Sequence, residues 1–284
     1  MPGWIYKFLI KTNFWVALAV AALCYLSLEP YSILPYHFLA FVFFATVSAY
    51  SYMRLVQYSG VHQDGFRAWQ KIFSRPVLWH WLYTLLAGLV SLYFLREIYR
   101  PGLAGVLFLP VLISVLYPIT FPRADTGFTS LRLLPGLKLF LIAFTWAYMT
   151  VLVPEALYGN MNVYALLEFV FRIILIASLV IPFDIRDLQE DDPSMHTLPQ
   201  VIGYRKAREL AFFGIFLYQL WLAIRVFAFD FDARSTLALI LAFELGAWLI
   251  RKAHPGRDES YFSFWIESIP IMAVLTLIVE SWLP

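Results

Sequence analysis

Long stretches of apolar residues recur along the whole of this 284-residue sequence. A helix that crosses a bilayer needs about 17–25 such residues. Nine stretches approach that length: Phe8–Leu28, Tyr36–Val56, Val77–Leu95, Leu103–Thr120, Leu133–Val153, Val163–Phe183, Leu210–Phe229, Ser235–Ile250 and Phe262–Leu283. Prolines such as Pro76 and Pro154 stand at many edges, where they are expected to end helices. The sequence therefore predicts an all-α membrane protein with nine transmembrane helices.

Composition supports this fold class and excludes others. Hydrophobic residues make up 61% of the chain and charged residues 14%, against about 45–50% and about 25% in a soluble domain. We expect one polytopic membrane domain over residues 1–284, because no polar linker or low-complexity tract divides it. The single cysteine, Cys24, can form no internal disulfide. A net charge of +2 without a basic stripe argues against nucleic acid as a partner.

The distribution of lysine and arginine predicts the orientation. With the N-terminus placed in the cytoplasm, sixteen of the 21 basic residues fall in cytoplasmic connections, four fall outside and one lies within a span. Such a bias follows the positive-inside rule and agrees with an odd number of crossings, which places the C-terminus outside. The residue within a span is Arg172, and Glu168 precedes it by one helical turn. This pair either handles an acceptor or a proton, or fixes helix packing.

The most informative polar segment follows the sixth run, at residues 181–210. Asp184, Asp187 and Asp191 have the spacing i, i+3, i+7, which places them within an arc of about 60° on one helical face. Carboxylates this close repel each other unless a cation neutralises them. A Mg²⁺ ion that bridges carboxylates to substrate phosphates is one solution. A solvated helix end neutralised by basic neighbours such as Arg186 is the other.

This segment resembles the second aspartate-rich motif of the UbiA-type intramembrane prenyltransferases. The string runs D-x-x-D-x-x-x-D from Asp184 to Asp191, then T-L-P at 197–199 and a glycine at Gly203. Its position after the sixth of nine helices also fits, and Leu133–Val153 is similar to the family's fifth helix. The resemblance implies a nine-helix bundle of UbiA-like type, with a central cavity open to the cytoplasmic side and to lipid.

The resemblance also implies a site. Asp184, Asp187 and Asp191 would be the catalytic ligands of Mg²⁺ and of a prenyl diphosphate. By charge alone, three further cations are candidates to contact phosphate: Lys138, Arg205 and Lys206. A snorkelling or topology-setting role is the competing interpretation for these three.

The family's first aspartate-rich motif, at the end of the second helix, is degenerate here. Residues 51–59 hold no carboxylate, and the nearest one is Asp64. Other residue types align with the motif's Asn and Asp positions: Ser51, Tyr52, Leu55 and Ser59. The segment offers Arg54 instead, which either contacts the diphosphate as a two-pronged donor or pairs with Asp187 or Asp191.

Two functions follow from these alternatives. The first is an integral membrane prenyltransferase, in a bacterial inner membrane, that moves a prenyl group from an isoprenyl diphosphate to a lipophilic acceptor, with an aromatic ring as one candidate. It would use fewer Mg²⁺ ions than its relatives. The second is a non-catalytic relative that binds an isoprenoid or lipid diphosphate. A transporter is less favoured, because no paired internal repeat is evident. The sequence predicts neither the acceptor nor the oligomeric state.

Overall fold

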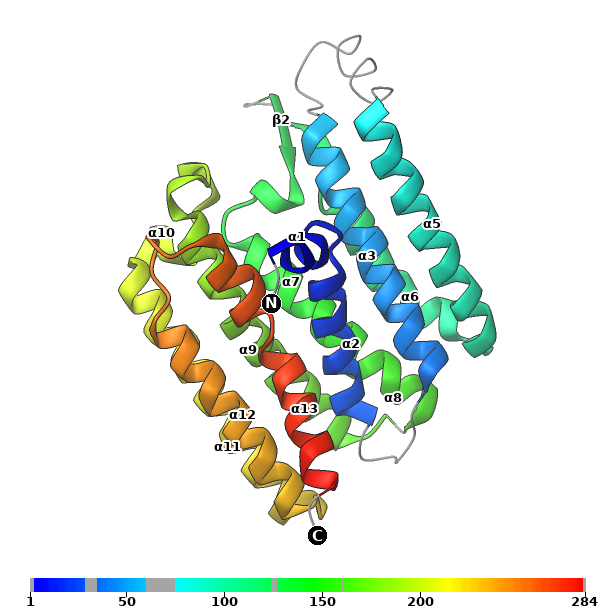
Figure 1. Ribbon diagram of the computed structural model, residues 1–284, viewed down its shortest axis with the longest axis vertical. Coiled ribbons are helices and arrows are strands. Elements are labelled where there is room, and N and C mark those ends of the chain that lie inside the picture. The colour runs from blue at the N-terminus through cyan, green and yellow to red at the C-terminus, as the bar shows by residue number, and fades with distance from the viewer. Residues whose placement is uncertain (1–2, 29–34, 60–74, 124–126, 160, 283–284) are drawn as a thin grey trace.

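The computed structural model describes residues 3–28, 35–59, 75–123, 127–159 and 161–282, and it is a bundle of long helices (Figure 1). Its helices and strands are α1 (Gly3–Lys11), α2 (Phe14–Leu28), α3 (Tyr36–Ser59), α5 (Arg75–Ile98), α6 (Leu103–Leu116), β1 (Thr120–Arg123), β2 (Gly127–Ser130), α7 (Leu137–Ala147), α8 (Val153–Tyr158), α9 (Val163–Arg186), α10 (Leu198–Ile202), α11 (Tyr204–Phe229), α12 (Ala233–Arg251) and α13 (Ile269–Ser281). Two π-helical turns, η3 (Tyr148–Leu152) and η6 (Tyr261–Ile266), adjoin α7 and α13.

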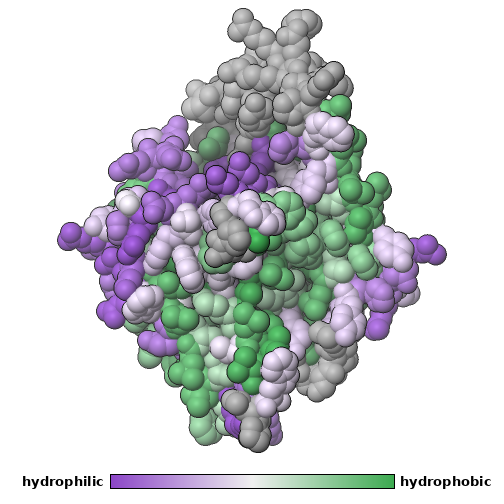
Figure 2. Space-filling model, in the orientation of Figure 1, coloured by the Kyte–Doolittle hydropathy of each residue, from purple (hydrophilic) through white to green (hydrophobic). Residues whose placement is uncertain are grey.

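Seven helices of the described chain are long and apolar enough to cross a membrane, and there are eight if the bent pair α1–α2 makes one crossing. The run predicted at 103–120 forms only the shorter helix α6. Hydrophilic residues gather at the end of the molecule that carries α10, and hydrophobic residues cover the flanks below it (Figure 2). The multi-pass membrane class is therefore supported. The ninth crossing and the predicted orientation of the termini stay predictions.

The first predicted run, Phe8–Leu28, is not one straight helix. It bends by 67° between α1 and α2, where Asn13 has a φ of 61°. Asparagine enters this left-handed region more readily than most residues, because its short polar side chain makes local hydrogen bonds. The Asn13 side-chain amide is buried and donates to Ser51 Oγ on α3 at 3.0 Å. This contact ties the bend to the second long helix.

The expectation that Pro154 ends a helix was wrong. A single apolar helical segment runs from Leu137 to Tyr158 through α7, η3 and α8, with Pro154 near the start of α8. Proline cannot donate the usual hydrogen bond to the carbonyl four residues before it. The wider turn at Tyr148–Leu152 precedes it, and there the Val153 N–H bonds to the Tyr148 carbonyl five residues back. The π-helical turn thus absorbs the proline within a continuous segment.

A short antiparallel hairpin was not predicted. Strands β1 and β2 pair from Thr120 opposite Ser130 to Arg123 opposite Gly127. Each strand has four residues, too few for a period-two pattern to stand out between two apolar runs. The hairpin leads the chain from α6 to α7.

Helix α9 lies at the centre of the packing, between α7 and α11. Its contact with α11 is close because Gly214 faces Ser178, and a Cβ atom on Gly214 would lie 2.1 Å from Ser178 Oγ. Small residues of this kind let membrane helices approach each other. The charged end of α9 therefore stands between two packed neighbours, α7 and α11.

The Glu168–Arg172 pair is a structural element of this core. Arg172 donates to Glu168, to the Leu23 carbonyl and to Ser27 Oγ. Glu168 also accepts from Tyr218 and Trp221 on α11. The pair joins α2, α9 and α11 with its hydrogen-bonding capacity used, and neither residue lines the cavity described below. Of the two roles considered for it, these contacts favour helix packing.

Candidate functional site

One cavity of about 1190 Å³ lies between α2, α3, α5, α6, α7, α9 and the segment before α13. Its two ends differ in chemistry. Charged residues line the end where α3 and α9 finish and α7 begins: Arg54, Arg132, Lys138, Asp184, Arg186, Asp187, Glu259 and Glu267. The rest is an apolar body, to which Val20, Val42, Leu95 and Leu107 contribute. The cavity therefore suits an amphiphilic ligand that has a charged head group and a long apolar part.

Two of the three motif aspartates meet at Lys138. Its Nζ lies 2.8 Å from Asp184 Oδ1 and 2.9 Å from Asp191 Oδ2. The contact with Asp191 has hydrogen-bond geometry, whereas the contact with Asp184 is an ion pair whose angles do not make a hydrogen bond. Lys138 is buried near the start of α7, and Asp184 is buried in the last turn of α9. The ammonium group therefore occupies the space between the two carboxylates.

Asp187 takes a different direction. The α-helix ends at Arg186, and Asp187 begins a 3₁₀ turn, so the three aspartates do not share one continuous helical face as the spacing predicted. Arg186 Nε and Nη2 bind the two Asp187 oxygens at 2.6 and 3.0 Å. Asp187 is thus neutralised by its own neighbour, in the fork geometry that arginine offers to a carboxylate.

Arg54 lines the charged end of the cavity together with Asp184 and Asp187. Its one hydrogen bond within the described chain goes to the Lys11 carbonyl at 3.4 Å, and no ion pair with Asp187 or Asp191 is present there. The alternative in which a salt bridge seals Arg54 is therefore not what the structure shows. Asp64, the carboxylate nearest in sequence, lies outside the described residues.

The other two predicted cations lie elsewhere. Arg205 and Lys206 are exposed near the start of α11 and do not line the cavity. Arg205 instead donates to the Tyr204 hydroxyl at 3.3 Å. Of the predicted site residues, the structure brings together Arg54, Lys138, Asp184 and Asp187, with Asp191 reached through Lys138.

Three charged residues of the cavity were not assigned to a site by the sequence: Arg132, Arg186 and Glu259. Arg132 lies between the hairpin and α7. Because the hairpin was not predicted, the sequence could not place Arg132 at the cavity. Glu267 follows the π-helical turn η6, which also places Ser263 in the lining. Glu244, another acidic residue in a late span, instead accepts from Gln219.

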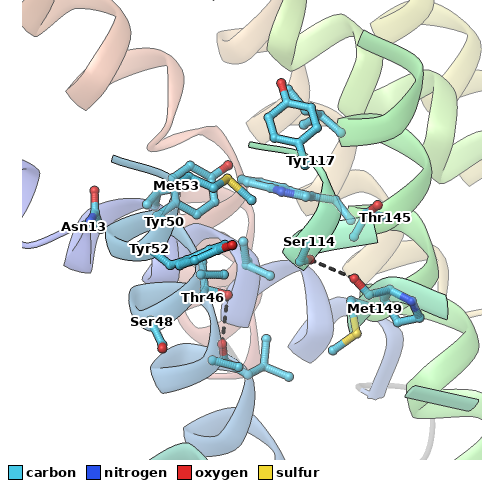
Figure 3. A pocket seen from close by; sticks show the side chains of 18 of the residues that line it. Asn13, Thr46, Ser48, Tyr50, Tyr52, Met53, Ser114, Tyr117, Thr145 and Met149 are labelled. Carbon is cyan, nitrogen blue, oxygen red and sulfur yellow. Dashed lines mark hydrogen bonds between the residues drawn. The ribbon is translucent and has the colours of Figure 1, made fainter. Parts of the chain in front are cut away.

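Several buried polar atoms of the lining have no hydrogen-bond partner within the described residues. They are Asn13 Oδ1, Trp81 Nε1, Thr145 Oγ1 and Asp184 Oδ2. Figure 3 shows Asn13, Tyr52, Tyr117 and Thr145 around the hollow, with Tyr52 reaching across it. The Tyr52 hydroxyl donates to the Val115 carbonyl of α6 at 3.4 Å. Because unsatisfied buried polar atoms are costly, these groups are suited to water or to a polar ligand.

The cavity is open on the side formed by α5 and α6. Leu89 and Leu92 of α5 and Phe108 and Val111 of α6 line it, yet each exposes more than half of its surface. Exposed apolar side chains on both helices make this the side of the cavity best suited to contact lipid tails.

A metal clamp built from facing carboxylate clusters does not fit these residues. Lys138 fills the space between Asp184 and Asp191, Arg186 occupies Asp187, and the facing segment of α3 offers Arg54. Within the described chain, no three His, Cys, Asp or Glu residues are grouped to hold a metal ion. The predicted set of Asp184, Asp187 and Asp191 as metal ligands gains no support from this geometry.

The architecture is similar to a solved structure of a UbiA homologue from Archaeoglobus fulgidus bound to GPP and Mg²⁺. The match has a TM-score of 0.63 at 12% sequence identity, and it covers 97% of this chain and 98% of the other. This chain has a UbiA-like fold. The UbiA-like bundle implied by the aspartate-rich segment is thus supported over nearly the full length, and the count of nine helices stays a prediction. No protein-family model and no curated protein sequence matches this chain.

Proposed function

We propose that this chain is a UbiA-like integral membrane prenyltransferase that moves a prenyl group from an isoprenyl diphosphate to a lipophilic acceptor. The observation that carries the proposal is the division of one cavity into a charged end and an apolar body. A prenyl diphosphate has the same division. The structural relative supports this substrate class, because it was solved with GPP in the same fold.

The charged end supplies the contacts for the diphosphate. Arg54, Arg132 and Lys138 are the cations we assign to its oxygens, because charge-assisted hydrogen bonds from such groups are the strong ones. Asp184 and Asp191 hold Lys138 in place, and Asp187 holds Arg186. In this assignment the motif aspartates position cations around the diphosphate.

The apolar body suits the reaction. When the bond between the prenyl carbon and the diphosphate oxygen breaks, the diphosphate keeps the electron pair and the prenyl group becomes cationic. Tyr50, Tyr52 and Trp146 line the cavity, and aromatic faces stabilise cations. An apolar lining excludes water and so protects the prenyl cation from reaction with water. The acceptor then forms the new bond and loses a proton, for which Glu259 and Glu267 are the nearby carboxylates of the lining.

In this proposal the acceptor enters from the bilayer on the side of α5 and α6. The exposed apolar residues there support a lipophilic acceptor, and an aromatic acceptor suits the aromatic lining. The location in a bacterial inner membrane stays a prediction from the sequence.

A second candidate function is a non-catalytic carrier or sensor of an isoprenoid diphosphate. The contact of Lys138 with both Asp184 and Asp191 favours it, because a fixed ammonium binds an anionic head group without a catalytic metal. The same cavity serves both functions, so only turnover separates them.

The test uses the purified full chain with labelled geranyl, farnesyl or geranylgeranyl diphosphate and a panel of lipophilic acceptors. Pyrophosphate release that is lost in Asp187→Asn and kept in Asp230→Asn supports the transferase, because Asp230 is an exposed aspartate after α11. Binding without turnover across the panel supports the second candidate. Absence of binding to all three diphosphates rejects both.

A further inference from the structure

We infer that Lys138 is a built-in replacement for a divalent cation, and that the charged end of the cavity binds an anionic diphosphate without added metal. The inference rests on the proposed function for the identity of the ligand. It rests on the geometry alone for the role of Lys138.

The position of the ammonium group is the first argument. Lys138 Nζ lies at 2.8 and 2.9 Å from oxygens of Asp184 and Asp191, one carboxylate in the last turn of α9 and one after its end. A Mg²⁺ ion that bridged these oxygens would need about 2.0–2.1 Å to each and further ligands in an octahedron. The ammonium group already fills that space, and a second cation beside it in a buried site would be repelled.

The surroundings of Lys138 are the second argument. Its side chain and both carboxylates are almost fully buried, so the ammonium is fixed by two partners and cannot swing to the surface at low cost. Burying a charge is tolerated when it is paired in this way. One ammonium between two carboxylates leaves this group with a net charge of −1, which the neighbouring cations must offset for an anion to bind.

Two further cations line the same end of the cavity, Arg54 on α3 and Arg132 just before α7. Neither has an ion-pair partner within the described residues. Residues 51–59, where a second carboxylate cluster would be needed for a metal clamp, contain no Asp or Glu. The charged end therefore has a side-chain cation from α7, Lys138, and another from α3, Arg54.

This arrangement predicts the effect of removing the ammonium. Lys138→Gln leaves Asp184 and Asp191 close together, buried and without their shared cation, which is the donor set that a divalent ion prefers. We expect the substitution to convert a metal-independent site into a metal-dependent one. Lys206→Gln is the matched control, because Lys206 is exposed on α11 and does not line the cavity.

The experiment measures geranyl diphosphate binding to the full chain in detergent or nanodiscs, in EDTA and in Mg²⁺, by calorimetry. For the wild type and Lys206→Gln, we expect the two affinities to agree within about twofold. For Lys138→Gln, we expect a loss of about tenfold or more in EDTA that Mg²⁺ restores. A wild type whose affinity falls about tenfold in EDTA overturns the inference while leaving the proposed function intact.

A second measurement needs no organic ligand. Mn²⁺ binding, followed by the loss of the free-ion electron paramagnetic resonance signal, is expected for Lys138→Gln and absent for the wild type. If the wild type binds Mn²⁺ and Asp184→Asn abolishes this binding, the inference is overturned. This result does not depend on diphosphate binding, whose absence would reject the proposed function separately. If Lys138→Gln does not fold, the wild-type comparison in EDTA and Mg²⁺ and the wild-type Mn²⁺ titration still decide.

Discussion

Arg172 Nη2 and Glu168 Oε1 lie 2.6 Å apart in the core of the bundle, with almost no surface of either side chain exposed. Tyr218, Trp221 and Arg225 of α11 also contact the Glu168 carboxylate. Because the partners of the pair come from α2, α9 and α11, it holds these three helices in a fixed relation. The pair should therefore contribute to stability, and its loss should lower the free energy of unfolding more than it weakens ligand binding.

Arg172→Met is expected to lower the free energy of unfolding by about 3–5 kcal/mol, because it leaves a buried carboxylate with too few cations. Arg208→Met removes the surface pair with Glu209 and should cost about 1 kcal/mol or less. Thermal unfolding of the detergent-solubilised protein, followed by circular dichroism, checks both. Equal midpoints for the two variants would show that the core pair contributes no more than a surface pair.

Gly214→Ala is expected to destabilise the chain by about 1–3 kcal/mol, as overpacking does, because the new Cβ would meet Ser178 Oγ. The double variant with Ser178→Ala removes that oxygen and should recover most of the loss. Gly105→Ala is the control, since a Cβ there meets nothing within 4 Å. The same unfolding assay measures all three. A double variant no more stable than Gly214→Ala would contradict the packing argument.

Arg54→Gln is expected to weaken binding of geranyl diphosphate by about 1.5–3 kcal/mol, the value of a hydrogen bond to a charged group. The reason is that Arg54 lines the charged end of the cavity and has no carboxylate partner within the described chain. Calorimetric titration measures the change. Arg205→Gln, which removes an exposed arginine outside the cavity, should leave the affinity unchanged, and an equal loss in both variants would argue for general electrostatic attraction.

Leu107→Trp is expected to narrow the tolerated prenyl length. Leu107 is buried in the apolar body of the cavity, and an indole there takes space from the far part of a long chain. The apparent affinity for geranylgeranyl diphosphate should fall by about tenfold relative to geranyl diphosphate. Leu237→Trp, on the exposed face of α12, should change neither. Competition binding with the two diphosphates reports the ratio.

The sequence was sufficient to predict features that depend on apolar segment length and on the spacing of charged residues. Apolar length set the positions of most helices, and the aspartate spacing pointed to the end of α9 that lines the cavity. It could not place features that depend on contacts between distant residues. The pairing of Lys138 with both Asp184 and Asp191 requires α7 to stand beside α9, which no local pattern reports.

Backbone detail was also beyond the sequence. Pro154 favours a helix end because it lacks an N–H group, yet the π-helical turn η3 before it lets the helix continue. Asn13 enters the left-handed region readily, but one asparagine beside a long apolar run does not by itself predict a bend, and its contact with Ser51 joins residues far apart in the sequence. Neither feature could be placed from apolar length alone.

The proposed entry of an acceptor on the side of α5 and α6 has a kinetic consequence. An acceptor that arrives through it is drawn from the hydrocarbon phase, so its relevant concentration is its mole fraction among the lipids. Diluting the protein in extra phospholipid at constant total acceptor should therefore slow turnover, while diluting the whole suspension with buffer should not. Saturation of the enzyme with acceptor would depend on the acceptor's concentration in the bilayer. Partitioning into the bilayer would determine which acceptors can compete.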